Sequence, residues 1–336
     1  MRRNKKSIMY SVVVCTYNRE KFIKECLRTL TNLDFPKNKF EIIVVDDGST
    51  DNTINIVKKF PVKLIQHSQN KGIGAARNTG LANAKGDVYI CFDDDCNVSK
   101  DWLKNLALAY EKFDKNKVAG IAGIIELKDK GGLIEKYVYE TGYGNPSPTH
   151  YTKTTNIFSR FFSYLKHMFL PSLETNKKFF EVGEIWGANC SFPVEVLKEV
   201  NGWDQNLSGV EDTDLCDRIK KKFPTKKFMC TKDAVLYHDH KLSLKNFLLK
   251  PYSRGVAIFN FYEKKEKAQP IFPFPILIIL LSALLTFINP LSVIFSLLLL
   301  PQLFYIWWGL KFITKRKAYY LLFPYLQAGY ELFSVL

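Results

Sequence analysis

Three consecutive carboxylates, Asp93, Asp94 and Asp95, end an apolar run at 88–92 that has the composition of a buried strand. Adjacent like charges repel one another, so a folded chain keeps them together where a cation or solvent compensates. Oxygen ligands of this kind suit a hard divalent cation, Mg²⁺ or Mn²⁺. A solvated acidic turn is the alternative interpretation of the triplet taken alone.

Two further apolar runs, upstream, stop at polar residues in the same way. The run at 11–15 ends in Thr16, Tyr17 and Asn18, and the run at 42–45 ends in Asp46 and Asp47. Parallel α/β sheets bind ligands beyond the carboxyl ends of their strands. We therefore expect these polar groups and the triplet to meet at one edge of one sheet.

Two late motifs offer a proton acceptor and a metal ligand. Glu211 and Asp212 follow Gly209 at the start of a segment with helical apolar spacing, where free backbone N–H groups keep a carboxylate ionised. Asp214 and Asp217 are expected on the surface of that helix. His238 follows an apolar strand at 234–236, and imidazole is a normal ligand for Mn²⁺ and a rarer one for Mg²⁺.

The elements between the motifs predict an α/β fold. Apolar residues at helical spacing predict helices at 19–33 and 51–60, and a short third strand follows at 62–66. The segment 70–84, with Gly72, Gly74 and Gly80, is a glycine-rich entry into another helix. A strand, a helix and a second strand form a right-handed βαβ unit.

In this order, the motifs resemble glycosyltransferase family 2, the inverting enzymes with the GT-A nucleotide-sugar fold. The resemblance covers about residues 8–240 and implies a mixed, mostly parallel sheet flanked by helices. The matching pieces are Val13-Val-Cys-Thr-Tyr-Asn18, Val44-Val-Asp-Asp-Gly-Ser-Thr-Asp51, Asn70-Lys-Gly-Ile-Gly-Ala-Ala-Arg-Asn78, Gly86-Asp-Val-Tyr-Ile-Cys-Phe-Asp-Asp-Asp95, Gly187-Ala-Asn, Gly202-Trp-Asp204 and Gly209-Val-Glu-Asp-Thr-Asp-Leu215.

The resemblance implies a role for each donor-side residue. Thr16 and Asp47 would hold the nucleotide base, with Asp47 accepting a hydrogen bond from a ring N–H, and Arg77 would steady the ribose or diphosphate. Asp93 would contact the ribose or the metal, and Asp95 would ligate the metal directly. The whole implied donor set is Thr16, Tyr17, Asn18, Asp47, Arg77, Asp93 and Asp94.

Transfer also needs a general base for the acceptor hydroxyl. The second acid of the late pair is the usual base in the family, which implies Asp212, with Glu211 positioning the acceptor. Several GT-A enzymes supply a late histidine as a metal ligand, which implies His238 beside Asp93 and Asp95. For His238, a hydrogen-bonded imidazole without a metal is an equally good interpretation.

Composition indicates where such an enzyme works. The net charge of +15 and the pI near 9.3 come without a recognisable nucleic-acid module, so anionic lipid explains them better than nucleic acid. The seven cysteines lack a paired metal-ligand spacing and are expected to be reduced. The residues before the first strand hold no apolar signal-peptide core, so we expect a cytoplasmic catalytic domain.

The chain changes character near Pro270. The segments 271–288 and 291–310 are apolar, uncharged and near the length of a membrane span. Basic residues at 263–267 precede the pair, and basic residues at 311–317 follow it. The two segments predict a multi-pass hairpin with Asn289 and Pro290 at its outer tip. A re-entrant hairpin is the alternative, because prolines bend or shorten helices. The segment 319–336 predicts a third span or an interfacial helix. We thus expect a catalytic domain at 1–240, an amphipathic interfacial segment at 241–269 and membrane-associated helices at 270–336.

Two segments between the metal motif and the base motif are candidates for acceptor binding. The segment 156–170 has aromatic residues at helical spacing, and a core helix is an equally good interpretation; the segment 142–149 is a loop rich in glycine and proline.

These features together predict an inverting, metal-dependent glycosyltransferase at the cytoplasmic face of the cell membrane. Its donor would be a UDP- or GDP-sugar and its acceptor a lipid-linked or membrane-proximal glycan. A processive polysaccharide synthase is one alternative, although the chain lacks the Gln-x-x-Arg-Trp pattern of those enzymes. A catalytically silent membrane scaffold is the other, and the intact acids at 47, 93, 95 and 212 argue against it.

Overall fold

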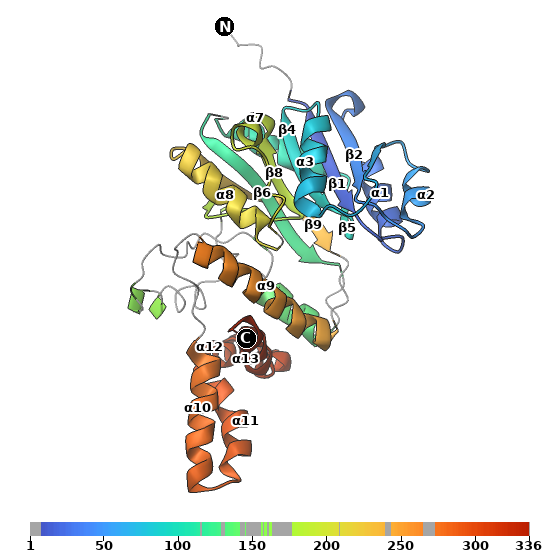
Figure 1. The fold of residues 1–336 in the computed structure, drawn as a ribbon. Helices are drawn as coiled ribbons and strands as arrows, with labels where there is room; N and C mark the ends of the chain where they lie inside the picture. The colour runs from blue at the N-terminus through green and yellow to red at the C-terminus, as the bar shows by residue number, and fades with distance from the viewer. Residues whose placement is uncertain are drawn as a thin grey trace. The chain divides into compact units, whose positions relative to one another are not determined.

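The computed structural model describes residues 8–114, 116–128, 132–141, 145, 156, 158–159, 161–162, 177–207, 209–238, 243–264 and 273–335. The chain divides into two compact units (Figure 1). Unit 1 comprises 1–128, 144–150 and 172–240, and unit 2 comprises 129–143, 151–171 and 241–336. Most of the residues in the segments predicted for acceptor binding, 142–149 and 156–170, lie outside the described residues.

A nine-stranded mixed sheet forms the centre of unit 1, in the order β3-β2-β1-β4-β8-β6-β9-β5, with β7 paired to β9. The strands are β1 (Tyr10–Thr16), β2 (Phe40–Asp46), β3 (Lys63–Gln66), β4 (Val88–Asp93), β5 (Cys96–Val98), β6 (Val118–Leu127), β7 (Phe179–Val182), β8 (Asn189–Pro193) and β9 (Lys227–His238). The helices of this unit are α1 (Ile23–Thr31), α2 (Thr53–Val57), α3 (Ile73–Asn83), α4 (Trp102–Lys112), α7 (Val194–Glu199) and α8 (Glu211–Lys222), with a 3₁₀ turn η1 (Lys37–Lys39).

The predicted mixed sheet flanked by helices is confirmed, and its parallel pairings hold more of the paired residues than its antiparallel ones. β3, β2, β1 and β4 are parallel, as the βαβ pattern requires, and β6 is parallel to β9. The other four pairings of the described strands are antiparallel. The motifs that carried the prediction lie mainly along β1, β2 and β4, so they did not predict which strands of the mixed sheet are antiparallel.

Strand alternation explains why helices cover both faces of the sheet. In β1, Tyr10, Val12 and Val14 enter one apolar cluster with α1 and α4, whereas Val13 enters the opposite cluster with α3, α7 and α8. Side chains of a strand alternate between faces, so a strand that is apolar at every position needs cover on both. This two-sided burial fixes the register that places the strand ends.

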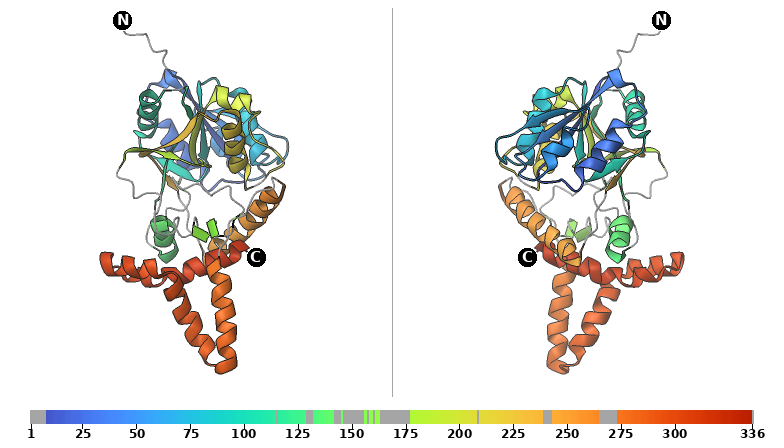
Figure 2. Two further views of the ribbon diagram at one scale, coloured as in Figure 1. Left: turned by 90° about the vertical axis from the view of Figure 1, so that its left-hand side faces the viewer. Right: turned by 90° about the vertical axis from the view of Figure 1, so that its right-hand side faces the viewer.

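Unit 2 is helical in its described residues. Its elements are α5 (Leu133–Thr141), α9 (Leu244–Lys264), α10 (Pro273–Ile288), α11 (Ser292–Phe304), α12 (Ile306–Lys315), a 3₁₀ turn η2 (Ala318–Leu321) and α13 (Phe323–Val335). α10 and α11 lie side by side as a hairpin, and α12 and α13 run crosswise at its open end (Figure 2). α9 packs along α13, where the Phe247 and Tyr330 rings lie 5.5 Å apart.

The predicted spans differ from the helices in the structure. The second apolar segment, 291–310, breaks at Tyr305, and α11 and α12 meet there with a bend of 69°. Within the described residues, only this bent pair has the length and composition to cross a membrane; α10 is shorter. Pro301 lies in the last turn of α11 and cannot donate a backbone hydrogen bond, which weakens the helix before the break.

Candidate active site

The carboxyl ends of three parallel strands lie level at one edge of the sheet in unit 1. Thr16 is paired in register with Asp46, and Cys15 with Asp93. Asp47 follows β2 directly, and its backbone N–H donates to the Thr16 carbonyl at 2.8 Å. The predicted convergence of Thr16, Asp47 and the aspartate triplet at one edge is therefore present.

Asp47 is buried in a dense set of hydrogen bonds. Its Oδ2 accepts from the Gly72 N–H at 2.8 Å, and its Oδ1 accepts from the Lys71 N–H at 2.9 Å. The Nδ1 of His67 lies 2.7 Å from the same Oδ1, and the Nε2 of His67 lies 2.9 Å from the Thr79 hydroxyl. The carboxylate is thus fixed in orientation, and Oδ2 keeps capacity for one further donor.

His67 is a residue that the sequence analysis missed. It directly follows β3, the neighbour of β2, so the same strand-end rule that found Asp47 would have found it.

Tyr17 and Asn18 border this edge in different ways. Tyr17 is exposed, whereas the Asn18 side-chain oxygen accepts from the Thr50 N–H at 2.8 Å. Asn18 also has a left-handed backbone, with φ of 54°, and its N–H donates to the Ser49 hydroxyl. Asn18 therefore ties the loop after β1 to the turn after β2.

The aspartate triplet is divided among three environments. Asp93 ends β4. Burial raises the pKa of Asp93, the positive charge of Arg77 lowers it, and the negative charge of Asp95 raises it. Asp94 is buried beside the exposed Arg19, with 3.4 Å between its Oδ1 and the Arg19 Nε. Burial raises the pKa of Asp94 to about 7, although the Thr16 hydroxyl and Arg19 act in the opposite direction.

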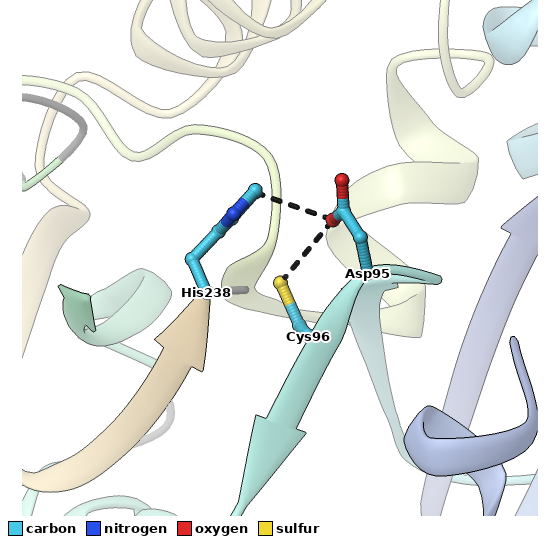
Figure 3. Close-up of side chains that lie close together, drawn as sticks. All are labelled: Asp95, Cys96 and His238. Carbon is cyan, nitrogen blue, oxygen red and sulfur yellow. Dashed lines mark hydrogen bonds and ion pairs between the residues drawn. The ribbon is translucent and has the colours of Figure 1, made fainter. Parts of the chain in front are cut away.

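Asp95 lies at a candidate metal centre with His238 and Cys96 (Figure 3). The His238 Nε2 is 3.2 Å from the Asp95 Oδ1, and the Cys96 thiol is 3.7 Å from the same oxygen. The antiparallel pairing of β5 with β9 sets Cys96 opposite His238, which explains why residues so distant in sequence meet. Burial and the neighbouring acids raise the pKa of the Cys96 thiol, which stays protonated and is a poor ligand for a hard cation.

Arg77, on α3, is buried and contacts both late acids. Its Nη1 donates to the Asp212 Oδ1 at 2.8 Å and to the Glu211 Oε1 at 3.1 Å. Burial alone would lower the pKa of Arg77, but the charges of Asp212 and Glu211 raise it well above its usual value. The structure therefore places Arg77 with the late acid pair, a contact that the sequence analysis did not foresee.

Asp212 accepts two further hydrogen bonds. The Trp203 indole N–H donates to Oδ1 at 3.0 Å, and the Gly187 N–H donates to Oδ2 at 2.9 Å. Trp203 is held in turn by Asn78 of α3, whose side chain bonds both its N–H and its carbonyl. Gly202 has φ of 63°, and a Cβ there would lie 2.2 Å from the Asn78 Oδ1, so the turn before Trp203 requires glycine.

The helix start predicted at Glu211 is present, since α8 begins at Glu211. The expectation for Asp214 is wrong, because this residue is buried and its Oδ2 accepts from the Arg218 Nε at 2.6 Å. Its position one turn before Arg218 makes the ion pair that allows burial.

Comparison with known proteins identifies the family of this chain. Residues 11–200 match the model of Glycosyl transferase family 2. A dolichyl N-acetyl-alpha-D-glucosaminyl phosphate 3-beta-D-2,3-diacetamido-2,3-dideoxy-beta-D-glucuronosyltransferase of Methanococcus voltae is 30% identical over 200 residues, covering 56% of this chain and 61% of the relative. Poly(ribitol-phosphate) beta-N-acetylglucosaminyltransferase TarS of Staphylococcus aureus is 40% identical over 123 residues, covering 34% of this chain and 22% of TarS.

A solved structure also shares the fold. The mannosyltransferase PcManGT from Pyrobaculum calidifontis, in complex with GDP-Man and Mn²⁺, matches with a TM-score of 0.55 and 19% identity. The match covers 96% of this chain and 86% of PcManGT. The chain spans less than two thirds of the length of each of the two curated relatives. The family match, which extends over more than half of the sequence, shows that this chain belongs to glycosyl transferase family 2.

Proposed function

We propose that this member of glycosyl transferase family 2 transfers one sugar, with inversion, from a UDP- or GDP-sugar to a lipid-linked or membrane-proximal glycan. The observation that carries the proposal is the double role of α3. Its N-terminus donates the Gly72 N–H to Asp47, and one turn later its Arg77 contacts Asp212. One helix thus links a nucleotide-binding strand edge to a candidate general base.

Donor binding is assigned to the edge formed by β1, β2 and β4. Asp47 would accept a ring N–H of the base through Oδ2, the oxygen that keeps capacity for a donor. Thr16 and the exposed Tyr17 border the same edge, and Asn18 shapes its loop. Asp94, paired with Arg19, completes the donor set that we assign.

A divalent cation is assigned to Asp95 and His238, which lie together, with Asp93 at the end of β4 as the further carboxylate ligand. Carboxylate oxygen with one imidazole suits Mn²⁺ better than Mg²⁺. Burial raises the pKa of Asp93 in spite of the nearby Arg77, and a bound cation would favour the charged form of this carboxyl. When bound, the cation would neutralise the developing charge on the leaving diphosphate.

Asp212 is assigned as the base that takes the proton of the acceptor hydroxyl. Arg77 carries one positive charge against the two negative charges of Asp212 and Glu211, so the cluster holds one negative charge in excess. A proton on Asp212 would leave Arg77 and Glu211 as a neutral pair. Oδ2 is the oxygen we assign as proton acceptor, because Oδ1 already accepts from both Arg77 and Trp203.

We further propose that unit 2 attaches the enzyme to the cytoplasmic face of the cell membrane. The described hairpin α10–α11 exposes a nearly continuous apolar surface, with Phe287 90% exposed and Ile288 82% exposed. An uncovered apolar surface of this kind marks a contact with lipid or protein. The basic balance of the chain favours anionic lipid.

The test is turnover of a panel of UDP- and GDP-sugars by the full chain in detergent, with Mn²⁺, Mg²⁺ or EDTA. We expect one donor to release its nucleoside diphosphate in a metal-dependent reaction, and NMR of the transferred sugar to show an inverted anomeric centre. Donor release without any metal dependence would contradict the cation site. No release from any donor would favour the silent scaffold, and long products from a single acceptor would favour the processive synthase.

A further inference from the structure

The hairpin α10–α11 is too short along its axis to reach from one headgroup layer to the other. α10 has 16 residues and α11 has 13, which correspond to about 24 Å and 20 Å at 1.5 Å per residue. The hydrocarbon core of a bilayer is about 30 Å thick. After the bend of 69°, α12 adds only about 5 Å along the axis of α11.

The turn at the tip of the hairpin pairs three of its backbone N–H groups within the chain. The Asn289 N–H donates to the Leu285 carbonyl, and the Leu291 N–H donates to the Asn289 side-chain oxygen at 2.9 Å. The Ser292 N–H donates to the Asn289 carbonyl, and Pro290 has no N–H. Backbone in hydrocarbon must find its partners within the protein, and these three N–H groups do so without water.

Residues typical of a membrane interface occur at one end of the hairpin. The segment 287–291, at the tip, contains no Trp, Tyr, Lys or Arg. The open end continues into aromatic and basic residues: Tyr305, Trp307, Trp308, Lys311, Lys315, Arg316, Lys317, Tyr319 and Tyr320. A span that crosses a bilayer carries interfacial aromatic residues at both ends.

The bend at the open end is fixed by a buried polar network. The Tyr305 hydroxyl donates to the Glu331 Oε2 at 2.8 Å, and the Gln327 side chain donates to the Glu331 Oε1 at 2.9 Å. The Trp308 indole N–H donates to the Gln327 oxygen at 2.7 Å. These bonds tie the junction of α11 and α12 to α13, so α12 is held crosswise to the hairpin (Figure 2).

α12 itself suits the plane of an interface. Ile306, Leu310 and Ile313 follow one another at helical spacing, and all three are more than half exposed. Lys311 and Lys315 lie on the same helix, where their long side chains can reach headgroups.

We propose that the hairpin α10–α11 enters the bilayer from one side only, that its tip at Ile288 ends inside the hydrocarbon, and that α12 lies in the headgroup layer. This placement replaces the multi-pass topology expected from the sequence. It rests on the proposed membrane attachment and is independent of the proposed transfer chemistry.

The test places one fluorescent probe at the tip and one on α12 of the full chain, in vesicles of phosphatidylcholine and phosphatidylglycerol. Ile288→Cys and Ile313→Cys, each exposed, are labelled with NBD, and the unsubstituted chain measures labelling of the seven native cysteines, which are buried or half-buried. Lipids with a nitroxide near the headgroup or deep on the acyl chain then quench the probes by depth. We expect the Ile288 probe to be quenched most by the deep nitroxide and the Ile313 probe by the shallow one.

Dithionite distinguishes a buried tip from one that emerges on the far side. The Ile288 probe should resist dithionite outside the vesicles, resist it again after a pore-forming peptide admits it to the lumen, and react after detergent is added. Reaction once pores form, or strongest quenching by the shallow nitroxide, would show a crossing hairpin and overturn the inference.

A second copy of the chain could cover the hairpin instead of lipid. A tip probe that no lipid nitroxide quenches, together with a dimer in sedimentation, would show that outcome and would also overturn the inference. Flotation of the unlabelled chain with vesicles tests attachment separately: failure to float would remove the proposed attachment itself. Donor turnover in detergent reports on the transfer chemistry whatever the depth of the tip.

Discussion

The two units place polar and apolar side chains in opposite ways. In unit 1, apolar strands fill the interior, and the buried Asp47 and the partly buried Asp212 have partners from distant segments. In the hairpin of unit 2, many leucine side chains and those of Phe287 and Phe295 are exposed, while Ser282 and Ser296 are buried. Apolar side chains are solvated poorly by water, so this difference supports the proposal that the hairpin contacts lipid, whereas unit 1 has the interior of a protein folded in water.

The two units also keep their shapes through different interactions. Unit 1 derives its register from two apolar clusters, one on each face of the sheet. Unit 2 derives its bend from hydrogen bonds among Tyr305, Gln327 and Glu331. Substitutions that remove charge should therefore affect chemistry in unit 1, whereas substitutions that add charge to the hairpin should affect attachment.

The largest effect is expected for Asp95→Ala. This change removes the carboxylate that we assign to the metal, and with it the charge stabilisation of the departing diphosphate. We expect transfer to fall to background and donor affinity in Mn²⁺ to weaken, with an unchanged melting temperature. Asp101→Asn, at an exposed acid that makes no cap bond at the start of α4, is the matched control. Near wild-type turnover of Asp95→Ala would remove the metal role, and unchanged metal dependence of His238→Ala would remove His238 as a ligand.

Asp212→Asn should reduce the rate of transfer by a factor on the order of 10²–10⁴, the usual loss for a general base. Donor affinity should change little, because Asp212 contacts Arg77 and Trp203 rather than the strand edge. The measurement is turnover against donor concentration, with thermal melting to check that the Gly187 contact survives. A loss of donor affinity without a loss of turnover would reassign Asp212 to binding or folding.

Adding charge to the hairpin tip tests whether its exposed apolar side chains contact lipid, in contrast to the buried apolar side chains of unit 1. Lysine near the centre of a bilayer costs about 2.5–3.5 kcal/mol, so the double variant Phe287→Lys, Ile288→Lys should shift the chain from vesicles to solution. In detergent, both its melting temperature and its donor turnover should be unchanged. Leu108→Lys, at a half-exposed apolar residue of α4, is the control and should not alter partitioning. Equal partitioning of the double variant and the parent would contradict lipid contact at the tip.

The smallest effect is expected for His67→Ala. The His67 ring bonds the Asp47 carboxylate at 2.7 Å, and a hydrogen bond to a charged group contributes about 1.5–3 kcal/mol. Because Lys71 and Gly72 still hold Asp47, we expect KM for the donor to rise by about tenfold or less, with kcat nearly unchanged. A purely structural role for His67 would lower the melting temperature and leave KM of the folded fraction unaltered.

Local patterns in the sequence were enough to predict much of the donor edge. Thr16, Asp47 and Asp93 each end an apolar run, and the two-residue period of a strand fixes their placement. The long-range partners could not be predicted in this way. The contact between Arg77 and Asp212 joins residues 135 positions apart, and Cys96 meets His238 across an antiparallel pairing that no local pattern encodes.

In the C-terminal helices, too, the contacts that decide the structure join residues that are distant in sequence. Hydropathy predicts two spans at 271–288 and 291–310, but it averages over Tyr305, where the helix turns. The bend depends on Gln327 and Glu331 of α13, which a window along the sequence does not connect to Tyr305.

Calorimetric titration of the full chain in detergent with UDP and with GDP, each with Mn²⁺ and with EDTA, tests the central claim most directly. The arrangement of Asp47, Asp93 and Asp95 at one strand edge predicts that one of the two nucleotides binds at a single site per chain. It also predicts that EDTA weakens this binding. If neither nucleotide binds in Mn²⁺, or if both bind equally well in EDTA, the strand edge is not a metal-dependent donor site and the account is wrong.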